Sequence, residues 1–475
     1  MPVDTLPDEV LLAIFDFFMD KDAKNRKEME AWQSLVHVCR RWRRVVFGSP
    51  RRLNLRLVCG TRTPVRDTLD VWPPLPLVIR GGAYQTESVV NFVAVLERSD
   101  RVCQIHLRGN YAPPMENVLA AMQQPFPELT DLVIKMLFDR VTVLPDSFLG
   151  GSAPHLRCLK LYGIPFPGLP KLLLSATHLV DLQLSNIPHS GYFSPEAMVT
   201  ALSMSTSLKL LSLKFLYSRS HPDSASRPPS TRSLLPVLET LSFAGFTEYL
   251  DDFVARIDAP RLDYLDVTSF NRYVLDTPQF MQLISRTSAF EVLKTAHIAF
   301  QFDSAVVKLS SETSGYAGLN VKIPCGELDE QLSSLQQVFT SCLPPLSTVT
   351  LEDLYIYENI DPDWSEDDIE DPLWLELLRP FTAVKNLYLS KEIASCIVPA
   401  LQQLIGDRIT EVLPALEKIS LEGLRFRGPS QEGIRNFIAA RRLSGHPITV
   451  SPAESPLFES ERDLEMSNWD SEFDE

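Results

Sequence analysis

The chain has 475 residues, of which 45% are hydrophobic and 22% charged, as in a globular protein. Its net charge of −16 argues against the broad basic surface of a nucleic-acid-binding protein, and no apolar run is long enough to cross a bilayer, so we expect neither nucleic acid nor membrane as a partner. The N-terminus lacks the features of a secretory signal, and seven scattered cysteines form no Cys-x-x-Cys pair, so we expect a cytoplasmic or nuclear protein.

The first predicted element is a helix that begins near Leu6. Pro7 is tolerated in a first helical turn, and Asp8 and Glu9 place negative charge at the positive end of the helix dipole. Apolar residues then recur at helical spacing through Phe18. We expect an amphipathic helix that needs a neighbour.

A second apolar stripe follows a charged link from Lys21 to Glu30. It predicts one helix with an apolar and a basic face, because arginines 40, 41, 43 and 44 are interleaved with the apolar residues. The apolar positions are Leu35, Val38, Cys39, Trp42, Val45 and Val46. We expect Cys39 to be a small buried apolar residue and not a reactive one.

Residues 3–50 resemble the F-box family in the pattern Leu-Pro-x-Glu, Ile14-Phe15, Val38-Cys39-x-x-Trp42 and Ser49-Pro50, followed by Leu53-Asn54-Leu55. Only the link from Met19 to Ala31 is longer than the family's usual turn. The resemblance implies binding to the Skp adaptor of cullin-RING ubiquitin ligases, with Trp42 and Val45 joining the module to the rest of the chain. The implied adaptor-binding residues are Leu6, Pro7, Ile14, Phe15, Leu35 and Val38. The alternative is an N-terminal helical cap on a repeat domain.

From residue 100 onward a six-residue motif (the repeat phrase) recurs, in which apolar residues occupy positions one, four and six. Its first seven copies begin 27, 27, 23, 29, 30 and 24 residues apart, a period typical of leucine-rich repeats. The copies are Val102–Leu107, Leu129–Ile134, Leu156–Leu161, Leu179–Leu184, Leu208–Leu213, Leu238–Phe243, Leu262–Val267, Leu346–Leu351, Val384–Leu389 and Leu416–Leu421, with weaker ones at Leu75–Ile79 and Leu293–Ile298. Each copy predicts a strand whose alternate residues point inward, followed by a return segment such as the helix expected at 194–202.

Because Asn or Cys is mostly missing from the position where leucine-rich repeats often carry it, we expect an irregular array. The whole chain thus resembles F-box proteins with a C-terminal leucine-rich-repeat domain, a large family in fungi. The implied fold class is α/β: all-α F-box helices, then a solenoid with parallel strands on its concave face and helices and loops on its convex face.

The expected domain organisation follows from these patterns. Residues 1–50 form the helical module, 51–100 a linker with the first solenoid strands, and 101–450 the repeats. The regular spacing of the repeats is lost near 298–346. We interpret this region as one enlarged repeat; a domain boundary there is the alternative. Residues 451–475 are expected to be an acidic disordered tail, and the acidic stretch 361–371 a solvated loop, with recognition of a basic partner as the other interpretation.

No motif for catalysis, phosphate binding or metal binding occurs in a convincing context, so we expect no catalytic residue, cofactor or metal. His155 and His178 fall at the same phase of adjacent repeats, but two ordinary strand residues explain them better than a metal pair. Strand positions that face away from the core are the candidate substrate-binding residues. They are Gln104, His106, Arg108, Asp131, Lys135, Lys160, Tyr162, Asp181, Gln183, Tyr264, Asp266, Lys418 and Glu422.

The sequence therefore predicts a non-catalytic substrate receptor of an SCF-type cullin-RING E3 ubiquitin ligase. Its partners would be the Skp adaptor, through it the cullin-RING ligase, and an unknown protein substrate. The alternative function is a leucine-rich-repeat scaffold or regulatory binding protein not linked to ubiquitination.

Overall fold

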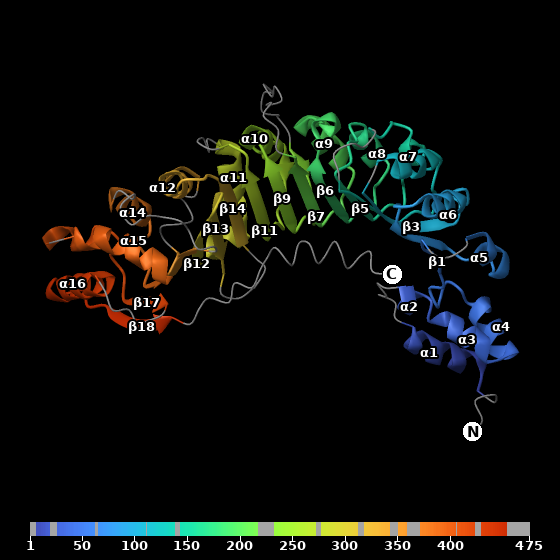
Figure 1. Cartoon of the computed structure of the whole chain (residues 1–475), viewed down its shortest axis with the longest axis horizontal. Coiled ribbons are helices and arrows are strands. Elements are labelled where there is room, and N and C mark those ends of the chain that lie inside the picture. Colours follow the sequence, from blue (N-terminus) through green and yellow to red (C-terminus); the bar gives the residue numbers. More distant parts are fainter. Residues whose placement is uncertain are drawn as a thin grey trace. The chain divides into compact units, whose positions relative to one another are not determined.

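The computed structural model describes residues 6–19, 26–61, 65–110, 112–137, 143–216, 232–271, 277–311, 318–342, 350–358, 371–404, 406–422 and 429–453. The described chain divides into two compact units, one up to Leu208 and the other from Lys209 onward. In each unit mostly parallel strands alternate with helices, and the helices lie along one side of the strands (Figure 1). The α/β class and the leucine-rich-repeat architecture expected from the sequence are confirmed.

The first unit begins with four short helices: α1 (Asp8–Phe18), α2 (Arg26–Met29), α3 (Trp32–Val38) and α4 (Arg40–Gly48). Pro7 precedes α1, and its carbonyl accepts hydrogen bonds from the amides of Val10 and Leu11, both at 3.1 Å. Asp8 and Glu9 lie in the first turn, as the sequence predicts.

The prediction of one continuous second helix is wrong, because the chain breaks at Cys39. This residue is extended, with φ −158° and ψ 169°, and ends α3. Its Sγ accepts a hydrogen bond from the Trp42 amide at 3.5 Å and so caps the N-terminus of α4. A helical apolar pattern can run through such a break because the side chains on both sides still face one core.

The strands of the first unit lie in chain order and pair in parallel. They are β1 (Leu57–Cys59), β2 (Leu77–Gly82), β3 (Val102–Gly109), β4 (Asp131–Met136), β5 (Cys158–Tyr162) and β6 (Asp181–Ile187). The helices that follow them are α5 (Val65–Val71), α6 (Thr86–Leu96), α7 (Ala112–Ala121), α8 (Leu169–Leu173) and α9 (Pro195–Leu202), with 3-10 turns η2 (Phe148–Gly151) and η3 (His189–Gly191). Helix α9 confirms the return helix expected at 194–202, and Ser194 caps it.

The strands of the second unit are β7 (Leu210–Phe215), β9 (Thr240–Gly245), β11 (Tyr264–Ser269), β12 (Thr295–Gln301), β13 (Ser304–Ser310), β14 (Gly318–Pro324), β15 (Asp353–Glu358), β16 (Asn386–Leu389), β17 (Lys418–Glu422) and β18 (Thr449–Ala453). Two short strands, β8 (Ser233–Leu234) and β10 (Ile257–Asp258), pair separately. The helices are α10 (Thr247–Ala255), α11 (Pro278–Arg286), η4 (Ser288–Val292), α12 (Leu328–Gln337), η5 (Val338–Cys342), α14 (Asp371–Leu378), α15 (Lys391–Gln402), η6 (Gly406–Thr410) and α16 (Pro429–Leu443).

The irregular region of the sequence is an antiparallel insertion into this sheet. The strand order is β11-β14-β13-β12-β15, so β13 and β14 lie between the repeat strands β11 and β12. Strand β13 is antiparallel to both of its neighbours, whereas β14 is parallel to β11 and β12 is parallel to β15. Strands β13 and β14 and helix α12 all lie within the region where the repeat spacing is lost, and their order in the sheet was not predictable from spacing.

One repeat phrase was placed in the wrong register. The sequence predicts the strand of this repeat at Leu346–Leu351, but the strand is β15, which begins at Asp353. The buried apolar positions of the repeat are Leu351, Leu354 and Ile356. Leu351 fits both readings, as the last apolar residue of one and the first of the other, so periodicity alone could not separate them. Residues 343–349 lie outside the described part of the chain.

Alternate strand residues point toward the helices and form the core. In the first unit Leu132, Leu159 and Leu182 are adjacent in register and fully buried. The residues between them point away from the helices, and we call that side of the sheet the open face. The acidic stretches 361–370 and 454–475, with the predictions made for them, lie outside the described residues, whereas residues 451–453 belong to β18.

Candidate protein-interaction surfaces

Arg41 fixes the first helix of the N-terminal module against the fourth. Its Nη2 lies 2.7 Å and its Nε 3.1 Å from Asp8 Oδ1, and Nη2 also donates to the Leu6 carbonyl. The start of α1 is therefore held by a charge-assisted pair of hydrogen bonds.

The core of this module forms around Phe15. Its ring packs on Trp42 with centroids 4.7 Å apart, and its side chain is 0% exposed. Leu35 on α3 is also buried. Of the residues assigned to the adaptor interface, these two therefore belong to the interior of the module, because a side chain without exposed surface cannot meet a partner unless the module rearranges.

The outward side of α1 is apolar instead of polar. Val10, Ile14, Phe17 and Phe18 are all exposed, and Phe17 is 95% exposed. At 100° per residue these four side chains fall within one quarter to one third of the helix circumference, so they form a single strip. We call these residues the α1 strip. A monomeric protein rarely leaves such a strip in water, which indicates a protein-binding surface.

The other predicted adaptor residues lie at the surface. Pro7 and Val38 are exposed and Leu6 is partly exposed. Phe17 was missed as an interface residue because it lies on the flank of the stripe read from the sequence; helix α1 turns that flank toward solvent.

Trp32 joins the module to the repeats, and Trp42, which was expected in that role, packs on Phe15. The Trp32 ring meets Trp72 at 5.0 Å and Phe47 at 5.9 Å, and its Nε1 donates to the Arg56 carbonyl at 3.0 Å. Met29 of α2 packs with Val58 and Val78, which lie on β1 and β2. Since Val78 is in register with the open-face residue Gln104, the module covers the open face at its first strands.

The open face of the first unit brings together nine of the predicted substrate-binding residues. Register places Gln104 beside Asp131, His106 beside Val133, and Arg108 beside Lys135. Gln104 donates to Asp131, Lys160 lies 3.9 Å from Asp181, and the Lys135 ammonium lies 5.5 Å from the Tyr162 ring centroid. The nine residues are Gln104, His106, Arg108, Asp131, Lys135, Lys160, Tyr162, Asp181 and Gln183.

The four predicted residues of the second unit do not form one group. Tyr264 and Asp266 lie on β11, whereas Lys418 and Glu422 lie on β17, six strands further along the sheet. Asp266 accepts hydrogen bonds from Ser242 and Asn320 and pairs with Lys214 at 3.7 Å, which favours a structural role.

A row of stacked aromatic rings on the open face of the second unit was missed. His297 stacks on Tyr355 at 4.4 Å, and Tyr355 stacks on Tyr388 at 4.0 Å. Burial, with a smaller contribution from Lys308, lowers the pKa of His297 to about 4, and burial raises the pKa of Tyr355. Reading β15 from Leu351 would have put Tyr355 in phase with Tyr388 and revealed this row.

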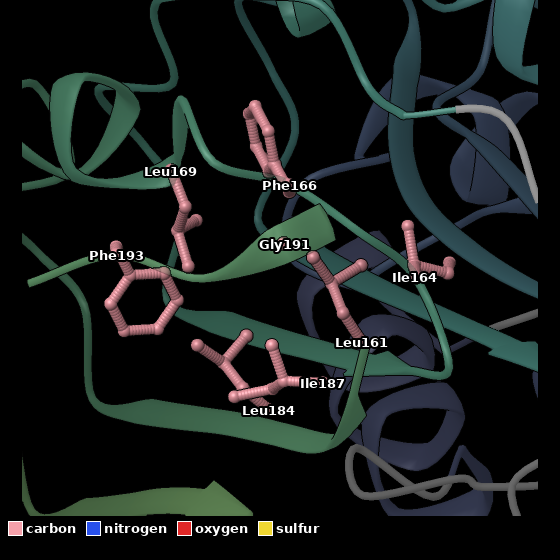
Figure 2. Close-up of a pocket in the computed structure, with 8 residues that line it drawn as sticks. All are labelled: Leu161, Ile164, Phe166, Leu169, Leu184, Ile187, Gly191 and Phe193. Atoms are coloured by element: carbon pink, nitrogen blue, oxygen red, sulfur yellow. The ribbon is translucent and has the colours of Figure 1, made fainter. Parts of the chain in front are cut away.

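A small cavity between β5 and β6 is lined by side chains of the core (Figure 2). Its lining is entirely apolar apart from backbone, and its roughly 220 Å³ includes open solvent. Ligand sites need larger spaces with some polar groups, so this cavity is a packing gap. The lining residues are Leu161, Ile164, Phe166, Leu169, Leu184, Ile187, Gly191 and Phe193.

Among the described residues, no three His, Cys, Asp or Glu side chains are placed to share a metal ion. None of the helices in the described ranges is both long and apolar enough to cross a bilayer.

Comparison with known proteins identifies the N-terminal module. The family model described as F-box-like matches residues 3–56. No curated protein matches the chain. Among solved structures, the leucine-rich repeat-containing protein LegL7 from Legionella pneumophila is similar at 10% identity and a TM-score of 0.28, over 88% of this chain and 97% of that one. Likeness at this level adds nothing to the fold described above.

Proposed function

We propose that the chain, in which a segment matching the F-box-like model precedes leucine-rich repeats, is the substrate-recognition subunit of an SCF-type cullin-RING E3 ubiquitin ligase. F-box domains generally bind Skp adaptors, so the partner at the N-terminus is a protein. The adaptor binds the helical module, and the repeats bind the substrate.

The observation that carries this proposal is the α1 strip. Val10, Ile14, Phe17 and Phe18 expose apolar side chains on a helix whose other side is held in the module core. Burying large apolar side chains at the centre of an interface supplies most of its binding free energy. The α1 strip lies within the segment that matches the F-box-like model. The partner that covers it is therefore the Skp adaptor.

The receptor itself does no bond chemistry in this proposal. Binding of the substrate raises the effective concentration of its lysines near the ubiquitin-loaded enzyme, which belongs to other chains. The scattered cysteines support a reducing location, the cytoplasm or nucleus; the described cysteines, Cys39, Cys59, Cys103, Cys158, Cys325 and Cys396, are free thiols.

The test is co-expression with the Skp adaptor, followed by affinity pull-down and size exclusion. The variant Ile14→Asp, Phe17→Asp places two carboxylates in the α1 strip, and we expect its affinity to fall at least 100-fold. The control Val90→Asp, Leu174→Asp places the same charges on exposed apolar residues, one on α6 and one directly after α8, and should bind normally.

Circular dichroism must show that both variants are folded. If wild type and both variants fail to bind, the proposal is overturned and the chain is a leucine-rich-repeat scaffold or regulatory protein. If the strip variant binds as well as wild type, the adaptor uses another surface of the module.

A further inference from the structure

Four cationic side chains gather on the open face of the first unit. Arg80 on β2, Arg108 on β3, Lys135 on β4 and Lys160 on β5 all point away from the helices. We call these four residues the cationic patch. Strands β2–β6 carry only two acidic residues, Asp131 and Asp181, in a chain whose net charge is −16.

The register of the sheet sets like charges side by side. Arg108 is directly opposite Lys135. Like charges opposite one another destabilise a sheet, so packing of the strands does not account for this arrangement. Within the patch, Lys160 lies 3.9 Å from the Asp181 carboxylate. The four cations of the patch still outnumber the two carboxylates on these strands.

Burial strengthens the electrostatic effect of the patch. Arg80 and Lys135 are only 7% exposed, whereas Arg108 and Lys160 are partly exposed. A positive charge at low local dielectric acts more strongly on an approaching anion than one in water. Arg108 and Lys160 therefore provide contact, and Arg80 and Lys135 add positive potential from beneath.

We propose that the cationic patch binds an extended, Asp/Glu-rich segment of a protein partner. Under the proposed function, on which this assignment rests, that partner is the substrate. The charge complementarity is direct: the patch is positive while the rest of the chain is acidic overall.

The geometry favours several single carboxylates over one phosphate group. Strands lie about 4.8 Å apart, so β2 to β5 spans about 14 Å, the length of four to five extended residues. Register distributes the four cations over this span in two rows, Arg80 with Lys160 and Arg108 with Lys135. A peptide with consecutive acidic residues matches such rows.

The position of the patch fits delivery to a ligase. Met29 of the F-box packs on Val58 and Val78, and Val78 lies two residues before Arg80 on the same strand. One end of the bound segment would thus lie beside the module that holds the adaptor.

The experiment measures binding of a fluorescent peptide with six consecutive Asp and Glu residues to the full chain by anisotropy. We expect binding that weakens as salt is raised, and at least a tenfold loss in the variant Arg108→Gln, Lys135→Gln. The matched control Lys308→Gln, Lys322→Gln removes two cations from β13 and β14 of the second unit and should bind as wild type does. A Gln/Ser peptide of equal length should not bind.

Equal binding by the patch variant and its control overturns the proposal. A singly phosphorylated peptide that binds over tenfold more tightly than the acidic one overturns the choice of a carboxylate-rich partner. If only a chain ending at residue 453 binds the peptide, the occupant is the chain's own acidic C-terminal sequence and the partner assignment is overturned. Adaptor pull-down with the same variants keeps this outcome separate from the proposed function, since the patch is not part of the α1 strip.

Discussion

The indole ring of Trp32 meets that of Trp72 edge to face, with ring centroids 5.0 Å apart and an interplanar angle of 80°. Trp32 belongs to helix α3 of the F-box-like segment, and Trp72 follows α5 of the repeats. This contact, with Phe47 beside it, sets how the module is held on the first repeats.

We expect Trp72→Ala to loosen the module from the repeats without unfolding them. Loss of a half-buried aromatic partner should cost about 2 kcal/mol of interface stability. In urea, the module of the variant should then unfold before the repeats, so its tryptophan fluorescence should show two transitions, whereas that of the wild type should show one. Val71→Ala, at an exposed neighbouring position, is the control and should leave the profile unchanged.

Substitution by alanine should destabilise the module at Phe15 and have little effect at Phe17. Phe15→Ala empties a fully buried site against Trp42 and should lower the free energy of unfolding of the module by about 3–5 kcal/mol. Phe17→Ala removes an exposed ring and should change it by less than about 0.5 kcal/mol. Thermal unfolding of the two variants checks this; similar losses in both would contradict the burial of Phe15.

Replacing Cys39 by serine should preserve the stability of the module better than replacing it by alanine. Its side chain caps α4 by accepting from the Trp42 amide, and a serine hydroxyl is a better acceptor at an N-cap. We expect Cys39→Ser to be more stable than Cys39→Ala by about 1 kcal/mol in chemical denaturation. If the alanine variant is the more stable, packing of the sulfur outweighs the cap.

His297 should make the stability of the second unit depend on pH. Burial holds its pKa at about 4 in the folded state, below the ordinary value of 6.5, so the unfolded chain binds more protons between these pH values. The free energy of unfolding should therefore fall as pH drops from about 6.5 to 4, by on the order of 2 kcal/mol.

The variant His297→Phe keeps a ring against Tyr355 and should flatten the pH profile over this range. His446→Gln, at an exposed histidine, is the control and should keep the wild-type slope. Denaturant unfolding at several pH values measures both; a His297→Phe profile as steep as wild type would assign the pH dependence to other groups.

Much of the fold was predictable because its signals are local. The phrase at Leu156–Leu161 and that at Leu179–Leu184 each carry the alternation of a half-buried strand, and the spacing between them leaves room for one return segment. The same alternation correctly predicted that Lys135 and Lys160 face away from the core. The start of α1 was predictable from Pro7 and the acidic residues after it.

Other features depended on contacts between distant residues. The apolar spacing of α1 places Phe15 in the stripe and Phe17 on its flank, but only packing on Trp42 decides which ring is covered. The spacing around Leu351 admits two strand registers, and pairing with β16 selects one. The pattern at Ala305 shows a strand without showing that it runs antiparallel between β12 and β14.

The sequence by itself determined the kinds of element, their order and the side of each strand that faces the core, because helical and strand periodicities are written in neighbouring residues. Only the tertiary structure decided the break at Cys39, the insertion of β13 and β14, the contact of Trp32 with Trp72 and the gathering of the four cations across β2–β5. Those features arise from pairing and packing between segments that are far apart in the chain. A local sequence pattern does not determine which distant segments meet or in which register they align.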